Sequence, residues 1–183
     1  PAPERSRSGE LALRYATDDV ALRAGLFRNR TSDLIVYDPA ADQASNIASA
    51  NIDGVELTVT TSVAGWRLQA DASFTRARDR STGERLLRRA PYGLHLAASR
   101  TVGRFDGVVE VSRAGERYDS DINTFVRTSL AAYTLARLAV SWRASEALRL
   151  TLRVENLFDA DYELVDGYNT PGRGLFAGVT VRL

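Results

Sequence analysis

The sequence contains no cysteine, no methionine and no lysine, and it has one histidine among its 183 residues. Without cysteine, the chain has no disulfides and no cysteine-bound metal site. A single histidine is too few for a histidine-based metal site or catalytic cluster, so we expect no metal, no cofactor and no enzymatic activity. The 24 arginines are balanced by 23 acidic residues. Because no excess of basic charge is available for a phosphate backbone, we expect no nucleic-acid partner.

Long apolar runs are also missing. No stretch comes near the roughly 20 apolar residues that cross a bilayer as a helix, and no segment resembles a signal peptide. This does not make the chain soluble, because a membrane β-barrel places its apolar side chains at every second residue. The lack of a start methionine predicts that Pro1 is a processing product or a cut inside a larger protein.

Apolar and polar residues alternate along most of the chain. In segment 148–155, apolar residues occupy the even positions, and Arg, Thr, Arg and Glu occupy the odd ones. This period of two predicts β-strands and no helix. The nine predicted strands are 10–15, 20–26, 55–60, 66–74, 92–98, 105–112, 133–143, 148–155 and 175–183.

The links between the predicted strands alternate in length. Short links at 16–19, 63–65, 102–104 and 144–147 are interleaved with long links at 38–50, 77–90, 115–128 and 159–173. In an antiparallel up-and-down meander, all short turns then lie at one end and all long loops at the other. Outer-membrane barrels have this asymmetry.

Two kinds of β protein share this alternation. A soluble β-sandwich or lipocalin-like barrel buries its apolar face, whereas a membrane barrel turns that face towards lipid. We favour the membrane barrel, because charged residues fill the polar rows and Trp66, Phe105 and Trp142 lie near strand ends, as interfacial girdles require. Single-chain bacterial barrels have an even strand number, so nine strands predict one misjudged strand or a part of a larger barrel.

Several segments carry recognisable motifs. Segment 154–162 has the sequence VENLFDADY, and segment 167–173 has the sequence GYNTPGR. The first resembles the N-L-F-D-x-x-Y signature near the end of TonB-dependent outer-membrane receptors. The second resembles the last extracellular loop of that family and is closest to the vitamin B12 (cobalamin) receptors. Segments 3–6, 27–35 and 51–57 resemble earlier parts of the family in the same order.

This resemblance implies a 22-stranded transmembrane β-barrel in the bacterial outer membrane, with a plug inside it. Residues 1–183 would then be the C-terminal portion of the barrel, with about nine strands. The plug domain and the TonB box are absent from the sequence, so TonB is a partner only through the missing N-terminal part. Lipid and lipopolysaccharide would surround the barrel. Leu183 stands where the family commonly ends in phenylalanine.

The implied function is TonB-coupled uptake of a large, scarce ligand. Cobalamin is the first choice because of segment 167–173, and a ferric chelate, as a siderophore or haem, is the alternative. A passive porin-type barrel would explain the alternation but not the two late motifs. An outer-membrane hydrolase would need a serine paired with His95, and the sequence has no G-x-S-x-G motif.

The long, extracellular loops are expected to contact the ligand. Aromatic side chains bind large rigid ligands well because they lose little conformational entropy, which makes Tyr118 and Phe125 candidates. The resemblance adds Tyr168 and its neighbour Asn169, because the tyrosine of the matching G-Y-x-T segment lies in the binding surface of cobalamin receptors. Tyr162 is expected to be the anchoring tyrosine of the signature.

The polar rows are expected to face a hydrated lumen. Their candidate members are Glu56, Arg67, Arg149, Arg153 and Glu155. We favour structural ion pairs over substrate contacts for these side chains.

Arginines also gather between residues 76 and 89. Arg85, Arg88 and Arg89 are candidate contacts to lipopolysaccharide, since arginine forms paired hydrogen bonds with phosphate. A solvated charged loop explains this cluster equally well. Segment 119–123 (DSDIN) opens like a calcium loop but lacks the glycine at position six and the acid at position twelve, so we interpret it as a solvated loop.

Overall fold

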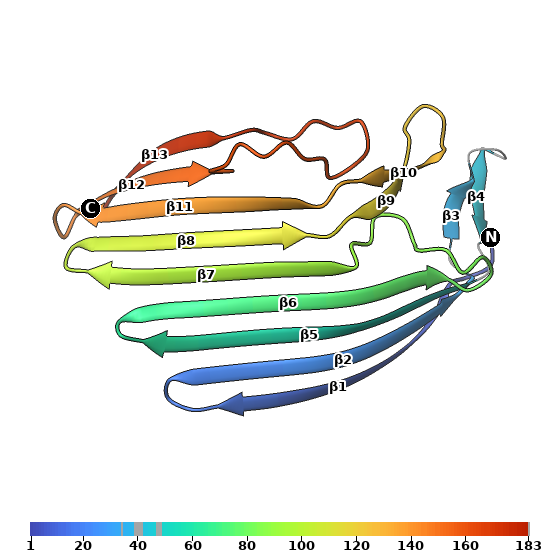
Figure 1. The fold of residues 1–183 in the computed structure, drawn as a ribbon, viewed down its shortest axis with the longest axis horizontal. Helices are drawn as coiled ribbons and strands as arrows, with labels where there is room; N and C mark the ends of the chain where they lie inside the picture. Colours follow the sequence, from blue (N-terminus) through green and yellow to red (C-terminus); the bar gives the residue numbers. More distant parts are fainter. Residues whose placement is uncertain (34, 39–41, 47–48, 183) are drawn as a thin grey trace.

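The main feature of the computed structural model, which describes residues 1–33, 35–38, 42–46 and 49–182, is one curved antiparallel sheet (Figure 1). None of these residues belongs to a helix able to cross a membrane. The sheet has nine strands, each hydrogen-bonded to the next along the chain, which confirms the predicted up-and-down meander. The strands are β1 (Arg5–Ala16), β2 (Val20–Ser32), β5 (Ser49–Val63), β6 (Trp66–Asp79), β7 (Tyr92–Val102), β8 (Phe105–Ala114), β11 (Tyr133–Arg143), β12 (Leu148–Glu155) and β13 (Gly174–Val181).

Two small hairpins lie in or next to two of the predicted long links, 38–50 and 115–128. Strand β3 (Ile35–Asp38) pairs with β4 (Gln43–Asn46), and β9 (Arg117–Ser120) pairs with β10 (Arg127–Leu130). The predicted long links are present, but these short strands were not predicted. Strands of four residues are too short for alternation to separate them from loops.

The short links and the long links of the main sheet lie at opposite ends of the strands (Figure 1). The short links 17–19, 64–65, 103–104 and 144–147 lie at one end, which we call the turn end, and the long links lie at the other, the loop end. In the link 64–65, Ala64 has φ of 50° and Gly65 has φ of 78°. Two positive φ values in a two-residue hairpin link are typical of a type I′ turn, whose twist matches that of the strands.

Four strands extend further towards the loop end than alternation predicts. Strand β1 begins at Arg5 instead of residue 10, and β2 ends at Ser32 instead of residue 26; β5 and β6 are also longer. In these extensions the outward positions are polar, as in the aligned row of Arg7, Arg30 and Asn51. The apolar pattern therefore stops while the backbone hydrogen bonding continues.

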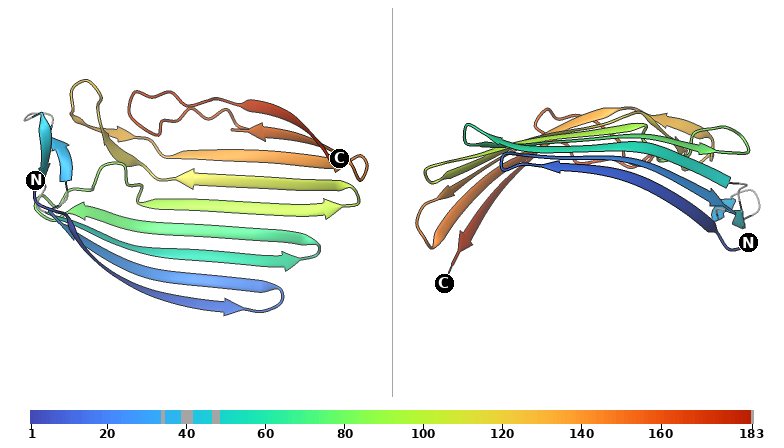
Figure 2. Two further views of the ribbon diagram at one scale, coloured as in Figure 1. Left: turned by 180° about the vertical axis from the view of Figure 1, so that it is seen from behind. Right: turned by 90° about the horizontal axis from the view of Figure 1, so that it is seen from below.

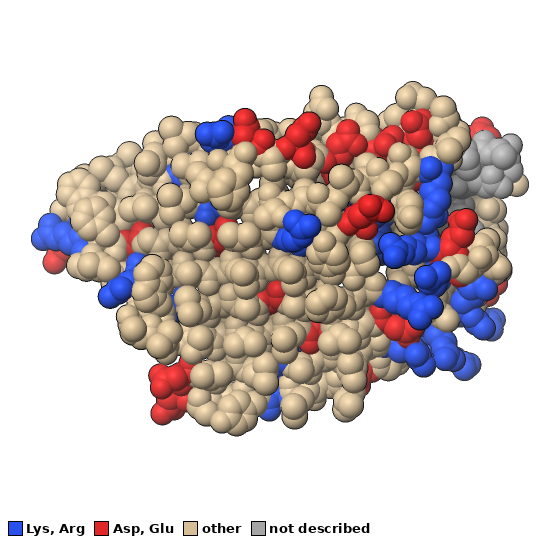
Figure 3. Space-filling view, in the orientation of Figure 1, with Lys and Arg blue, Asp and Glu red and all other residues tan. Residues whose placement is uncertain are grey.

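The sheet is a single curved layer with a convex and a concave face (Figure 2). Strand register puts the apolar rows, such as Leu11, Leu26 and Val55, on one face and the polar rows on the other. Figure 3 shows the convex face, which is nearly free of charge over the strands, while arginines gather at the loop end. The buried hydrophobic residues of the described ranges are Ala50, Ala77, Leu130 and Ala136. The rows of Leu and Val are exposed rather than packed into a core. This contradicts the soluble sandwich or lipocalin alternative, because those folds bury their apolar rows.

Aromatic residues mark both limits of the apolar band on the convex face. At the turn end, the Phe105 and Trp142 rings stack with centroids 6.2 Å apart, and Arg100 Cζ lies 5.4 Å from the centroid of Trp66. Towards the loop end, Phe74 occupies the same face of β6 as Trp66. The strand between these two residues rises about 27 Å. Outer-membrane barrels have an apolar band of about 25 Å.

Strands β1 and β13 are the two edges of the sheet, which does not close on itself within the described ranges. Strand β13 ends at Val181. Leu183, which we predicted as the last residue of this strand, lies outside the described residues.

Candidate functional site

Three long links meet at the loop end around one buried carboxylate. Asp119, in β9, has 0% of its surface exposed. Its Oδ1 accepts hydrogen bonds from Arg88 Nε at 2.7 Å and Ser120 N at 2.8 Å, and its Oδ2 accepts one from Asp166 N at 3.0 Å. Arg88 and Asp166 belong to the links before and after the one that contains Asp119, so this carboxylate joins all three. We call the links 80–91, 115–132 and 156–173 the loop cluster.

The Asp119 side chain is ionised when it joins the three links of the loop cluster. Burial alone would raise the pKa of Asp119, but hydrogen bonds from the Asp166 backbone and the Arg88 side chain outweigh burial and lower the pKa below its ordinary value. Asp121, at the tip of the same link, also has a lowered pKa, because the backbone and hydroxyl of Thr124 donate to its carboxylate. Both carboxylates are therefore already engaged as acceptors within the loop cluster. In the part of the chain that the structure describes, no group of three or more His, Asp or Glu side chains is placed to hold a metal ion.

Two arginines add further bonds between the links. Arg117 is buried, and its Nη2 donates to the Glu163 carbonyl at 2.5 Å. Arg127 Nη2 donates to the Arg85 carbonyl at 2.8 Å, and its guanidinium carbon lies 4.1 Å from the ring centroid of Tyr118. Guanidinium groups suit this role because they donate several hydrogen bonds in fixed directions.

The N-L-F-D-x-x-Y segment closes the base of the last link. The Asn156 amide donates to the Ala160 carbonyl at 2.9 Å and accepts from Ala160 N at 2.9 Å. Across the base, Asp159 Oδ1 accepts from Arg173 N at 2.7 Å. Asn156 and Asp159 have φ of 47° and 55°, a conformation that asparagine and aspartate adopt more readily than most residues. The segment thus fixes where the link leaves β12 and where it joins β13.

Tyr162, the tyrosine of this motif, attaches the link to β11. Its ring lies 4.7 Å from the ring of Tyr133, centroid to centroid. Its carbonyl accepts a hydrogen bond from Thr170 Oγ1 at 2.5 Å. These contacts place Tyr162 in the framework of the link.

The tips of the loop cluster expose apolar and aromatic side chains. Tyr168 is 59% exposed and Phe125 is 58% exposed. The tips of two links lie close together, since a Cβ at Gly167 would lie 3.4 Å from Ile122 Cγ2. Further exposed apolar residues of the cluster are Leu87, Ile122, Val126, Phe158 and Leu164. Apolar groups held on a polar framework suit a bulky amphipathic ligand.

The four predicted ligand contacts have different surroundings. Phe125 and Tyr168 are exposed at the tips, and Asn169 is also exposed and forms a β-bridge with Glu163. Tyr118 is partly covered and lies against the Arg127 guanidinium, so it contributes to the framework. Contact of these residues with a ligand stays a prediction.

The predicted lumenal residues Glu56, Arg67, Arg149, Arg153 and Glu155 all lie on the concave face by strand register. Arg153 Nε lies 3.2 Å from Glu155 Oε1. Arg149 Nη2 lies 3.8 Å from Asp106 Oδ2. These pairs agree with a structural role, and a contact with substrate stays a prediction.

A second polar group lies at the centre of the concave face. His95 Nδ1 is 3.3 Å from Asp71 Oδ2, and its Nε2 is 4.0 Å from Glu110 Oε2. Arg137 Nη2 donates to Glu110 Oε1 at 2.5 Å. Both ring nitrogens of His95 face carboxylates, whereas a hydrolytic triad needs one of them at a serine hydroxyl.

The three arginines predicted to contact lipopolysaccharide are exposed at the loop end. Arg88 is engaged with Asp119, and the backbone of Arg85 is engaged with Arg127. Contact of Arg85, Arg88 and Arg89 with lipopolysaccharide stays a prediction.

Sequence reasoning missed the role of Asp119. It placed this residue in a solvated segment, whereas its side chain is the centre of the loop cluster. In β9, Arg117 and Asp119 are buried and Tyr118 and Ser120 are not. The sequence does not signal this, because Arg153 and Glu155 have the same spacing in β12 and are only half-buried.

The fold and motifs have a counterpart among known families. Residues 2–157 match the family model described as TonB dependent receptor-like, beta-barrel. The chain belongs to this TonB-dependent receptor family.

Solved structures show the same fold at low sequence identity. The copper transporter OprC superposes with a TM-score of 0.81 at 19% identity over 98% of this chain. The siderophore receptor PirA from Acinetobacter baumannii gives 0.79 at 19% identity over 98%. The ferripyoverdine receptor of the outer membrane of Pseudomonas aeruginosa gives 0.81 at 18% identity over 98%.

This TonB-dependent receptor chain spans 31%, 32% and 27% of those three proteins, respectively. The family and these relatives are outer-membrane receptors and transporters rather than enzymes.

Proposed function

We propose that this chain forms part of the barrel of an outer-membrane uptake receptor for a bulky metal chelate, with the loop end outside the cell. The tips of the loop cluster are then part of its ligand-binding surface. The observation that carries the proposal is the joining of three long links by Asp119, which brings Phe125 and Tyr168 to the same end of the sheet. A prearranged surface favours binding because fewer side chains and loops lose freedom when the ligand arrives.

We also propose that residues 1–183 act as the C-terminal portion of a larger barrel, together with a plug and a TonB-contacting segment from elsewhere in the receptor. The open edges at β1 and β13 support this proposal, since unpaired edges favour further strand pairing. The polar concave face also supports it, because a hydrated lumen or a polar plug suits charged side chains.

Cobalamin and a ferric siderophore are the two ligand candidates. The G-Y-x-T-P-G-R segment supports cobalamin through its resemblance to cobalamin receptors. The siderophore receptor PirA and the ferripyoverdine receptor support a ferric chelate. Both ligands are large and rigid around a metal, so exposed aromatic groups on a firm framework serve either one.

The test is Tyr168→Ala in the receptor that contains this chain, with binding of cyanocobalamin and of several ferric siderophores measured on purified protein. We expect affinity for the true ligand to fall about tenfold, since a hot-spot aromatic contributes at least about 1.4 kcal/mol. The matched control is Tyr15→Ala, which removes a tyrosine of similar exposure (57% against 59%) at the turn end. Unchanged affinity for all ligands, with the barrel folded, would contradict the proposal.

A further inference from the structure

A pocket of about 750 Å³ lies at the turn end, between the links 103–104 and 144–147 and the end of β13. Figure 1 shows these three segments together at that end of the sheet. Strand register places Arg149 and Thr180 of the lining on the concave face. The volume lies in the range of about 300–1,000 Å³ that is usual for small-molecule sites. Four arginines line the pocket, namely Arg104, Arg143, Arg149 and Arg182.

Two of these arginines are directly opposite each other. Strand register pairs Arg143 of β11 with Arg149 of β12, and like charges in that position destabilise a sheet. Asp106 Oδ2 lies 3.7 Å from Arg143 Nε and 3.8 Å from Arg149 Nη2, so both arginines share one carboxylate beyond hydrogen-bond distance. Asp106 Oδ1 already accepts a hydrogen bond from Thr101 Oγ1 at 2.7 Å. The repulsion between the two guanidinium groups is therefore only partly offset.

Backbone carbonyls fix the positions of two guanidinium groups. Arg104 Nη1 donates to the Ala144 carbonyl at 3.1 Å, and Arg143 Nη2 donates to the Gly103 carbonyl at 3.1 Å. A guanidinium group has five N–H donors, so both arginines keep donors for a ligand. Donors that are already in position favour binding, because little side-chain freedom is lost when the ligand arrives.

The pocket has an excess of positive charge. Glu146 is the acidic residue of its lining. In the part of the chain that the structure describes, Arg104, Arg182 and Glu146 form no ion pair. If Glu146 and Asp106 each neutralise one of the four arginines, two positive charges remain. An anion between the arginines would remove this excess.

Another opposed arginine pair on the concave face has a carboxylate of its own. Arg14 of β1 is directly opposite Arg23 of β2. Arg23 Nη2 donates to Glu10 Oε1 at 3.1 Å, within hydrogen-bond distance. The uncompensated charge is therefore a property of the pocket and not of every arginine pair on this face.

We propose that this pocket binds a multiply charged anion through the oxygens of its carboxylate or phosphate groups. Guanidinium groups hold such oxygens through paired hydrogen bonds. The inference rests on the proposed function, in which the concave face lines the lumen and the turn end opens to the periplasm. The anion is then either free in the periplasm or part of an anionic metal chelate that leaves the receptor. The second source would restrict the transported chelate to an anionic one.

The experiment measures binding of pyrophosphate and of citrate to the purified receptor in detergent by calorimetry. The variant with Arg143→Gln and Arg149→Gln is expected to bind both anions at least tenfold more weakly. The matched control, with Arg14→Gln and Arg23→Gln, removes the other opposed pair and should keep wild-type affinity. Acetate should bind the wild-type receptor at least tenfold more weakly than citrate, because it offers one carboxylate to several arginines.

A variant of the shared carboxylate should have the opposite effect. Asp106→Asn removes the negative charge that competes with the ligand, so citrate should bind at least threefold more tightly. The matched control is Glu155→Gln, which removes a carboxylate 3.2 Å from Arg153 on the same face and should leave citrate affinity unchanged. Weaker binding in Asp106→Asn would contradict the proposal.

Thermal unfolding separates an anion site from a structural ion pair. Citrate should raise the unfolding midpoint of the wild-type receptor but not of the variant with Arg143→Gln and Arg149→Gln. Without citrate, this variant should unfold at the wild-type temperature or above it, because the repulsion has been removed. No binding to the wild-type receptor at about 1 mM, or equal affinity of wild type and variant for both anions, would overturn the proposal.

Competition identifies the source of the anion. Displacement of citrate by a trianionic ferric tris-catecholate would assign the pocket to a transported anionic chelate, whereas binding of citrate and pyrophosphate without this displacement would assign it to a free anion. Displacement by neutral cyanocobalamin would overturn the proposal, because charge would not then decide binding. The Tyr168→Ala test of the loop cluster does not involve the turn end, so failure of the proposed function remains a separate result.

Discussion

The turn end and the loop end belong to the same strands but are held by different interactions. At the turn end, links as short as 64–65 and an aromatic belt that includes Trp66 and Trp142 complete the apolar band. At the loop end, the buried carboxylate of Asp119 and the amide of Asn156 hold long links through hydrogen bonds. The comparison shows that the alternation of apolar and polar side chains determines the structure of the turn end, whereas specific polar contacts determine the structure of the loop end.

The sharpest test of this comparison places a charge within the apolar band. Leu96→Arg, at a 54% exposed position on the convex face, should lower the free energy of unfolding in lipid by about 2–4 kcal/mol, because the guanidinium would face hydrocarbon. Ala97→Arg is the matched control on the concave face, where its neighbours in register are Gln69 and Glu110. Denaturant titration of the receptor in vesicles measures both, and equal losses would contradict a lipid-facing convex surface.

The loop end should respond to loss of its central carboxylate. Asp119→Ala leaves the half-buried amide of Asp166 and the guanidinium of Arg88 without their acceptor, which costs about 1–3 kcal/mol of local stability. Hydrogen exchange at the Ser120 and Asp166 amides should therefore accelerate about tenfold or more. In the control Asp121→Ala, only the turn around Thr124 should loosen, and unchanged exchange at Asp166 in Asp119→Ala would refute the role of this carboxylate.

Acidic pH should destabilise the loop end of the sheet and leave the turn end unaffected. The pKa of Asp119 is lowered in the folded state, so its ionised form stabilises the loop cluster above about pH 4, and this contribution is lost as the pH falls through the lowered value. Protease cleavage of the loop cluster should stay constant from pH 7 to 5 and rise in stronger acid, while the turn end stays protected. Asp119→Asn should show no such acid step; a step retained in that variant would assign it to another group.

The smallest effect is expected at a turn. Ala64 has φ of 50°, which asparagine adopts at lower cost than alanine. Ala64→Asn would create the Asn-Gly pair typical of type I′ turns and should raise the stability by about 0.5 kcal/mol. Gly65→Ala should lower it, since φ of 78° at that residue disfavours a side chain. Thermal unfolding midpoints compare the two variants, and shifts of the same sign would contradict the assigned turn.

The strands of the apolar band follow from the sequence because their signal is local. Leu148 to Glu155 alternates without interruption, and β12 has these bounds. The extension of β1 to Arg5 does not follow, since Gly9 and Arg7 give outward positions no apolar character. Outside the apolar band, both faces of a strand contact water, so polar side chains are suitable on either face. Hydrogen bonding between the strands therefore continues there without alternating apolar and polar residues.

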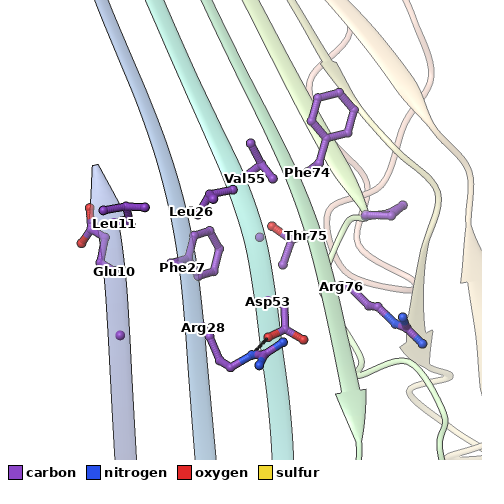
Figure 4. Close-up of a pocket in the computed structure, with 13 residues that line it drawn as sticks. Glu10, Leu11, Leu26, Phe27, Arg28, Asp53, Val55, Phe74, Thr75 and Arg76 are labelled. Atoms are coloured by element: carbon purple, nitrogen blue, oxygen red, sulfur yellow. Dashed lines mark hydrogen bonds and ion pairs between the residues drawn. The ribbon is translucent and has the colours of Figure 1, made fainter. Parts of the chain in front are cut away.

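The candidate site was less predictable because it depends on contacts between distant segments. Exposed aromatic residues such as Tyr168 and Phe125 follow from composition and motif. The hydrogen bond between Asp119 and Asp166 joins residues 47 positions apart, and no sequence spacing predicts it. A groove on the convex face, lined by Leu11, Leu26, Val55 and Phe74, likewise exists only once four strands are in register (Figure 4).

The hydrogen bonds that Asn156 and Asp159 form at the base of the last link have an evolutionary consequence. Since these two side chains fix the base of the last link from within it, substitutions between residues 163 and 169 can change its tip without shifting β12 or β13. The proposed ligand-binding surface can therefore diversify by point mutation while the barrel wall is inherited unchanged.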